Sequence, residues 1–211
     1  MAAVNPTTIA DDILNTVLGM APTATQPHID LQIRNTVREF LQKSLCWREV
    51  LKTKTLVGKT KYYLNPVDAY AIVSQVIEVT LDGVPLAKPG HAINSLGSYI
   101  IENNKDLILT HAPKKAGLPL WIGVALQMKP GITAIPDFVG QQYFDGIVSG
   151  TMARLHGENA KAYSSLERSD VERKKFLAEV VRARDAAAKM YTRGTSGWKF
   201  PYFASGKLRG A

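Results

Sequence analysis

The stretch that decides the fold is IPDFVGQQYFDGIVSGTMARLHG, residues 135–157. Pro136 and Asp137 suit the first turn of a helix, because an N–H is unpaired there anyway and a carboxylate is favourable at the positive end of the dipole. Gly157 predicts the helix end through a left-handed residue. We therefore expect one buried central helix with an apolar side made of Phe138, Val139, Tyr143, Phe144, Ile147, Val148, Met152 and Leu155.

Three glycines lie inside this helical stretch, at Gly140, Gly146 and Gly150. Each should cost about 1 kcal/mol relative to alanine, a cost usually tolerated where another backbone comes close. The four-residue spacing of Gly146 and Gly150 is also found in membrane helix dimers, but Asp145 and Arg154 exclude an apolar span. The glycines thus predict close helix packing in a globular core.

The chain has 211 residues, a formal net charge of +8 and 45% apolar residues. This length can bury a real core, and the charge favours an acidic partner such as nucleic acid or an acidic protein surface. The single cysteine, Cys46, excludes an internal disulfide and fits a reducing compartment. The sequence contains neither a secretory signal pattern nor an apolar run long enough to span a membrane. We expect a soluble protein made in a cytoplasm, with no membrane partner.

Helical periodicity flanks a β-rich middle region. Residues 7–19 and 27–47 carry apolar residues at helical spacing, which predicts two amphipathic helices. Strand patterns follow at 54–57 and 61–64, at 72–81 with an Asp82-Gly83 turn, and at 98–101 and 107–110. Residues 118–128 alternate strictly, as a strand with one buried face does. We expect a small antiparallel β domain at 52–134.

The last predicted helix, about 166–191, is densely charged. Its apolar side is expected to contain Val171, Phe176, Leu177, Val180, Val181 and Ala187. Its cations are candidates for a DNA-facing surface: Arg173, Lys174, Lys175, Arg182 and Arg184. Two other interpretations remain open, a solvated face with i,i+4 ion pairs and a surface against an acidic ring neighbour.

The segment 192–211 is glycine-rich and contains no acids. It is too short for a core of its own, so its aromatic residues should be buried elsewhere, either on its own chain or on another subunit. The expected partner-binding residues are Trp198, Phe200, Pro201, Tyr202, Phe203, Lys207 and Arg209.

Residues with catalytic or metal-binding potential are scattered. The four histidines (His28, His91, His111, His156) have no metal-ligand spacing, and no Walker loop, dinucleotide fingerprint or G-x-S-x-G motif occurs. We expect no catalytic, cofactor or metal site, and thus no enzyme.

The order of these parts resembles a known family. EFLQKSLCWREVL (39–51) is followed by VIEVTLDGVPL (76–86), IPDF (135–138), the Gly150–Leu155 turn and the charged segment 173–184. This arrangement resembles the head-to-tail adaptor proteins of tailed bacteriophages, similar to the tail tubular protein A of short-tailed phages.

The resemblance implies a ring, a dodecamer in that family, between the portal protein and the tail nozzle or tail tube protein. It also implies non-specific contact with DNA in the central channel and a place in the virion at the head–tail interface, after assembly in the host cytoplasm.

From these patterns we expect an α+β chain. An antiparallel helical bundle (1–51 and 135–191) is interrupted by the inserted β domain (52–134) and followed by an extended C-terminal arm (192–211). The favoured function is the structural adaptor ring. The alternative is a non-sequence-specific nucleic-acid-binding protein that uses the basic face of the last helix.

Overall fold

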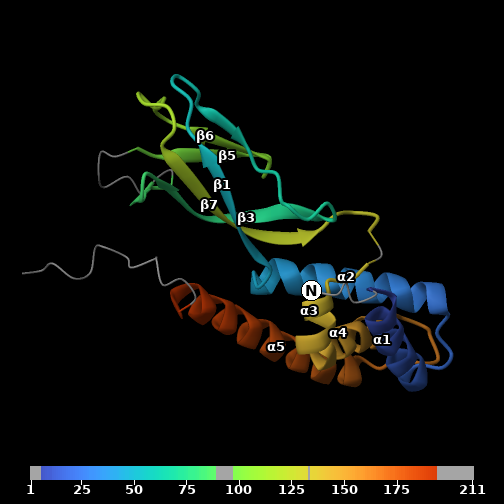
Figure 1. Ribbon diagram of the computed structural model, residues 1–211. Helices are drawn as coiled ribbons and strands as arrows, with labels where there is room; N and C mark the ends of the chain where they lie inside the picture. The colour runs from blue at the N-terminus through green and yellow to red at the C-terminus, as the bar shows by residue number, and fades with distance from the viewer. Residues whose placement is uncertain (1–5, 89–96, 133, 194–211) are drawn as a thin grey trace, which may run out of the picture.

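The structure is a computed structural model that describes residues 6–88, 97–132 and 134–193. It is an α+β fold with helices gathered at one side and strands at the other (Figure 1). The helices are α1 (Pro6–Met20), α2 (Gln26–Ser44), α3 (Asp137–Gln142), α4 (Phe144–His156) and α5 (Leu166–Arg193). The strands are β1 (Arg48–Lys54), β2 (Lys61–Tyr63), β3 (Ala71–Leu81), β4 (Val84–Pro85), β5 (Tyr99–Glu102), β6 (Asp106–Leu109) and β7 (Pro119–Met128).

Helix α4 lies at the centre of the helical core, in contact with α1, α2, α3 and α5. Its Ile147 and Leu155 are fully buried, as are Phe40 on α2 and Phe176 on α5. The rings of Phe40 and Phe176 are 6.2 Å apart between centroids. Burial of each such side chain contributes on the order of 1.5–3 kcal/mol, so this cluster is a main source of stability for the helices.

The predicted close packing at the central glycines is confirmed for two of them. A Cβ on Gly150 would lie 2.5 Å from the Phe176 ring and 2.5 Å from the Thr36 methyl group. A Cβ on Gly146 would lie 2.9 Å from the Cβ of Glu179. The two glycines therefore let α2 and α5 approach α4 more closely than any side chain would permit.

The single continuous helix predicted across 135–157 is wrong, because the chain breaks at Tyr143. This residue has φ −128° and ψ 25°, outside helical geometry, and it separates α3 from α4. The break directs the Tyr143 ring onto Phe40, with 4.9 Å between centroids, while Val139 and Ile147 on either side stay fully buried. The change of direction at Tyr143 therefore lets α3 and α4 both keep apolar side chains in the helical core.

The predicted left-handed end at Gly157 is also wrong. Gly157 has φ −78° and ψ −6°, and its N–H donates to the Ala153 carbonyl at 3.1 Å. The Ser169 hydroxyl of α5 donates to the same carbonyl at 2.7 Å. The Ala153 carbonyl near the end of α4 therefore has two hydrogen-bond donors, one of them from α5. The helix can end there without a left-handed residue.

The strands form two antiparallel sheets, one in the order β1-β7-β3-β4 and one in the order β2-β6-β5. Buried residues of both sheets belong to one core cluster, among them Tyr62, Tyr99 and Leu107 opposite Leu120 and Ile122. The two sheets therefore face each other around a core of their own.

The alternation at 118–128 correctly predicts a strand. In β7, Leu120, Ile122, Val124, Leu126 and Met128 are all buried. The predicted Asp82-Gly83 turn is confirmed between β3 and β4, with positive φ at both residues (52° and 77°). The strands predicted at 98–101 and 107–110 are confirmed, each shifted by one residue, as the antiparallel pair β5 and β6.

The predicted start of the β region needs correction. Helix α2 ends at Ser44 rather than Trp47, because Leu45 takes a left-handed conformation (φ 52°). The first strand is β1 rather than 54–57, because residues 48–54 pair along the full edge of β7. Strand β2 joins the other sheet, so β1 and β2 do not pair with each other.

Trp47 lies at the junction and packs against both cores. Its carbonyl accepts the Leu126 N–H at 2.7 Å, and its ring meets Phe138 edge-on at 6.2 Å. The step from α2 into β1 is thereby fixed by contacts on both sides.

Among the described residues, no helix combines the length and the apolar character needed to cross a bilayer.

Candidate interaction surfaces

Helix α5 packs on one side only. Phe176, Val180, Ala183 and Ala187 form its buried stripe, which faces the other helices. Val171, Leu177 and Val181, predicted on the same apolar side, are instead 49%, 39% and 57% exposed. That part of the prediction is wrong because α5 carries two apolar stripes and the neighbouring helices cover only one. We call the exposed surface with Val171, Lys174, Leu177, Val181 and Arg184 the α5 outer face.

The structure divides the predicted DNA-facing cations of α5 into paired and unpaired groups. Lys175 pairs with Glu172 at 2.7 Å, and Arg182 pairs with Glu179 at 2.6 Å. The predicted i,i+4 pairs are thus i,i+3 pairs. Arg173 turns inward to Glu39. Among the described residues, no carboxylate pairs with Lys174 or Arg184, which are both exposed on the outer face.

Glu39 on α2 joins three helices through one carboxylate. Arg154 on α4 donates to its Oε2 at 2.6 Å, and Arg173 on α5 donates to both oxygens, at 2.6 and 3.2 Å. Lys43 adds a contact of 2.6 Å within α2. Burial alone would raise the pKa of Glu39, but hydrogen bonds from these three cations outweigh burial and lower the pKa from 4.5 to about 2. This cluster fixes the inner side of α5 and hence the direction of its outer face.

A second carboxylate cluster surrounds Glu158, just after α4. His28 lies 2.6 Å from Glu158 Oε1, Gln32 donates to the same oxygen at 3.2 Å, and the Tyr163 hydroxyl donates to Oε2 at 2.9 Å. His156 Nδ1 lies 2.6 Å from the Tyr163 carbonyl oxygen, which accepts a hydrogen bond when Nδ1 carries the hydrogen. These contacts tie the start of α2 to the loop between α4 and α5.

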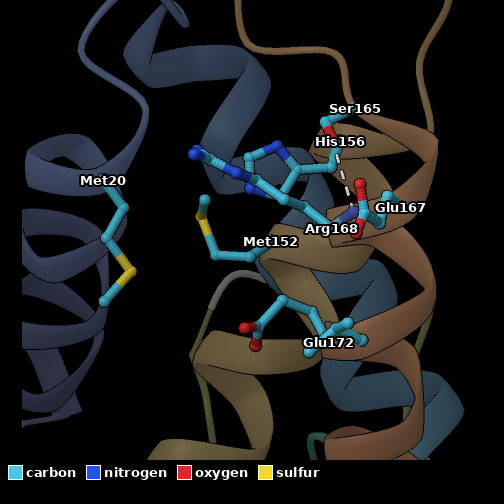
Figure 2. A pocket seen from close by; sticks show the side chains of 8 residues that line it. Met20, Met152, His156, Ser165, Glu167, Arg168 and Glu172 are labelled. Carbon is cyan, nitrogen blue, oxygen red and sulfur yellow. Dashed lines mark hydrogen bonds between the residues drawn. The ribbon is translucent and has the colours of Figure 1, made fainter.

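A hollow of about 520 Å³ lies beside these contacts. Figure 2 shows Met20 of α1 opposite Met152 of α4, with His156, Arg168 and Glu172 also lining the space. No group of three His, Cys, Asp or Glu side chains suited to a metal ion occurs in residues 6–88, 97–132 and 134–193.

The loop between β2 and β3 exposes another apolar surface. Tyr63 is 67% exposed, Val67 91% and Tyr70 58%. Tyr63 lines an adjacent groove of about 670 Å³. We call Tyr63, Val67 and Tyr70 the β2–β3 surface. Large apolar side chains left exposed near one another in the sequence mark a candidate docking place for another macromolecule.

The predicted arm residues Trp198, Phe200, Pro201, Tyr202, Phe203, Lys207 and Arg209 lie outside the described residues, so their partner-binding role stays a prediction. Helix α5 itself continues to Arg193, two residues beyond the predicted end.

Neither the Glu39 nor the Glu158 cluster was predicted from the sequence. Apart from Lys43 and Tyr163, their partners are separated from the two glutamates by 115 to 134 residues along the chain, and the acids involved have no distinguishing local pattern. The exposed stripe of α5 did have a signal in the sequence, because Leu177 and Val181 are four residues apart and alternate with the Phe176–Val180 stripe.

No protein-family model matches the chain, and no curated protein matches it significantly. The surfaces described above are therefore the basis for any functional proposal.

Proposed function

We propose that the chain is a structural adaptor that forms a ring between the portal and the tail of a bacteriophage, with DNA passing through the central channel. The observation that carries the proposal is the α5 outer face. It presents Val181, 57% exposed, and Leu177, 39% exposed, beside the unpaired cations Lys174 and Arg184. An apolar centre flanked by charges is the usual composition of a subunit interface.

A complementary surface exists on the same chain. Helix α1 contains Asp11 and Asp12, both exposed, and no lysine or arginine. On the neighbouring α2, Leu31 is 46% exposed. Helix α4 contacts both α1 and α5, and in Figure 1 α5 runs from beside α4 away from α1. We propose that the α5 outer face of one copy contacts α1 and Leu31 of the next, a head-to-tail contact that closes into a ring when the rotation permits.

An adaptor also has to bind partners other than itself. The β2–β3 surface supports a second docking site that is separate from α5, and the aromatic arm beyond Arg193 could supply a third. We propose that these two surfaces contact the portal and the tail nozzle or tube. In this proposal the helices act as the predicted antiparallel bundle, which forms the ring, and the β part reaches the neighbouring protein.

The test is the mass of the purified full chain, measured by sedimentation and native mass spectrometry. Val181→Asp should reduce the assembly to single chains while the circular dichroism stays unchanged, because Val181 is exposed and contributes little to the core. Ile100→Asp is the matched control, since Ile100 is 48% exposed on β5, away from α5, and should leave the assembly intact.

A charge exchange tests the proposed α1–α5 pairing. Asp11→Lys with Asp12→Lys should weaken assembly, as should Lys174→Glu with Arg184→Glu. Combining the four substitutions should restore it, because the charges are then reversed on both sides. If the combined variant assembles no better than either double variant, α1 is not the surface that α5 contacts.

A further inference from the structure

Five lysines gather at the end of the β part. They are Lys52 and Lys54 on β1, Lys59 in the β1–β2 loop, and Lys114 and Lys115 in the β6–β7 loop, and all five are exposed. We call these five residues the lysine tip. In Figure 1 the two loops, cyan and yellow-green, lie next to each other at the end of the β part that points away from the helices.

Backbone hydrogen bonds hold the two loops together. The Gly58 N–H donates to the Pro113 carbonyl at 3.2 Å, and the Gly117 N–H donates to the Thr55 carbonyl at 2.8 Å. The Thr55 hydroxyl donates to the Lys115 carbonyl at 3.0 Å. The lysines from the two loops are therefore kept together by the fold.

The lysine tip carries a nearly uncompensated positive charge. None of its five ammonium groups forms an ion pair with a carboxylate of the described residues, whereas the neighbouring Lys61 pairs with Asp106 at 2.9 Å. The adjoining turn between β3 and β4 contributes one acid, Asp82. The backbone N–H of Asp82 donates to the Pro119 carbonyl, which places this turn beside the start of β7. The ammonium of Lys52 lies 5.6 Å from the centre of the Trp121 ring, and that of Lys59 lies 5.4 Å from the Tyr62 ring. Cation–π contacts thus position two of the lysines without neutralising their charge, which can still attract an anion.

We propose that the lysine tip is the surface through which this protein contacts the phosphate backbone of duplex DNA, without reading its sequence. Lys52 and Lys54 lie two residues apart on one strand, a rise of about 6.7 Å. Alternate residues of a strand point to the same face of the sheet, so both ammonium groups can reach one DNA backbone. Lysine acts as a point charge toward phosphate and does not offer the forked donor pattern with which arginine reads guanine.

The lysine tip fits DNA better than α5 does. Of the five cations predicted to face DNA on α5, Arg173, Lys175 and Arg182 are already paired with carboxylates. The other two, Lys174 and Arg184, lie beside an apolar stripe. An apolar stripe suits a protein partner, while a group of unpaired lysines suits a polyanion. DNA as the partner rests on the proposed function, but the tip can be tested on free protein and DNA, independently of ring formation.

Two apolar residues in the same loop make a membrane surface the competing occupant. Leu56 is 54% exposed and Val57 is 66% exposed. Insertion into a bilayer would use both side chains, whereas phosphate contact uses neither. Two aliphatic side chains offer only a small apolar area for insertion into a bilayer, whereas five lysines attract a polyanion strongly. We therefore favour DNA as the occupant, and we use Leu56 and Val57 to distinguish DNA from a membrane.

The experiment measures binding of the full chain to a fluorescent duplex of arbitrary sequence by anisotropy, between 50 and 200 mM salt. Five phosphate contacts predict a slope of log K against log salt near −4.5, or a loss of about 500-fold over this range. Lys114→Gln with Lys115→Gln should make the slope shallower by about 1.8. Lys175→Gln with Arg182→Gln on α5 should leave it unchanged, because both cations are already paired with carboxylates. All variants are compared at the same oligomeric state.

Leu56→Ser with Val57→Ser should bind DNA as the natural chain does. The inference is overturned if the Lys114/Lys115 variant keeps the full salt slope, or if the α5 variant loses it. It is also overturned if the chain prefers vesicles containing phosphatidylglycerol over the duplex and the Leu56/Val57 variant releases them, because the tip would then be a membrane surface. Because variants are compared at the same oligomeric state, these outcomes are read separately from ring formation.

Discussion

Replacing Glu39 by glutamine should weaken the helical core in a way that depends on pH. In the folded protein the pKa of Glu39 falls from 4.5 to about 2, because three hydrogen-bonded cations outweigh the effect of burial. A depression of this size corresponds to roughly 3 kcal/mol of stability at neutral pH. Arg154 and Arg173 are 32% and 37% exposed, so solvent screens part of this energy. We expect Glu39→Gln to lower the free energy of unfolding by about 2 kcal/mol at pH 7.

The pH dependence follows from the sign of the change. A carboxyl group whose pKa is lower in the folded state stabilises the fold above its unfolded pKa of 4.5, and this contribution is lost as the pH falls toward 2. By pH 3 less than about half of it remains. The difference between the natural chain and Glu39→Gln should therefore shrink from pH 5 downward.

Urea unfolding followed by circular dichroism, at several pH values between 7 and 3, measures this difference. Glu102→Gln is the matched control, because Glu102 is 52% exposed and its contact with Lys61 is 3.5 Å. It should change stability by less than about 0.5 kcal/mol. Equal stability of Glu39→Gln and the natural chain at pH 7, or a deficit that does not vary with pH, would refute the role assigned to Glu39.

Three further predictions can be checked on the same protein. Gly150→Ala should destabilise by about 1–3 kcal/mol in urea, because its methyl group would overlap the Phe176 ring, whereas Gly19→Ala has free space and should be neutral or stabilising. Burial raises the pKa of Cys46, so in 5,5′-dithiobis(2-nitrobenzoate) assays at pH 8 its thiol should react more slowly in the folded protein than in urea. Deletion of residues 194–211 should leave the melting temperature and helix content of the single chain nearly unchanged but abolish ring closure or portal attachment. A truncated chain that unfolds by itself yet still assembles when cooled would contradict that last expectation.

Local patterns in the sequence predicted the strands better than the helical packing. The alternation from Leu120 to Met128 has a period of two and marks the face of β7 that packs in the core between the sheets, although Gly123 and Ala125 on the other face are buried as well. On α5 two apolar stripes are interleaved, and the sequence does not say which one meets α4. The break at Tyr143 was missed for a similar reason, because the apolar periodicity continues through it.

The candidate surfaces depend on pairings across long stretches of chain. Glu39 finds Arg154 and Arg173 only once α2, α4 and α5 are packed together. The lysine tip forms because β1 pairs with β7, which brings the loop after Lys54 to the loop before Pro119. A usable signal was present in LKTKTLVGKTK (51–61), where lysines recur without any acid.

The central claim, a ring closed through the α5 outer face, is tested most directly by the mass of the purified full chain over a wide concentration range. We expect a single closed assembly whose mass is a whole multiple of 23.1 kDa, and which Val181→Asp converts to single chains. A natural chain that remains monomeric at every concentration, or a Val181→Asp variant that assembles as the natural chain does, would contradict it.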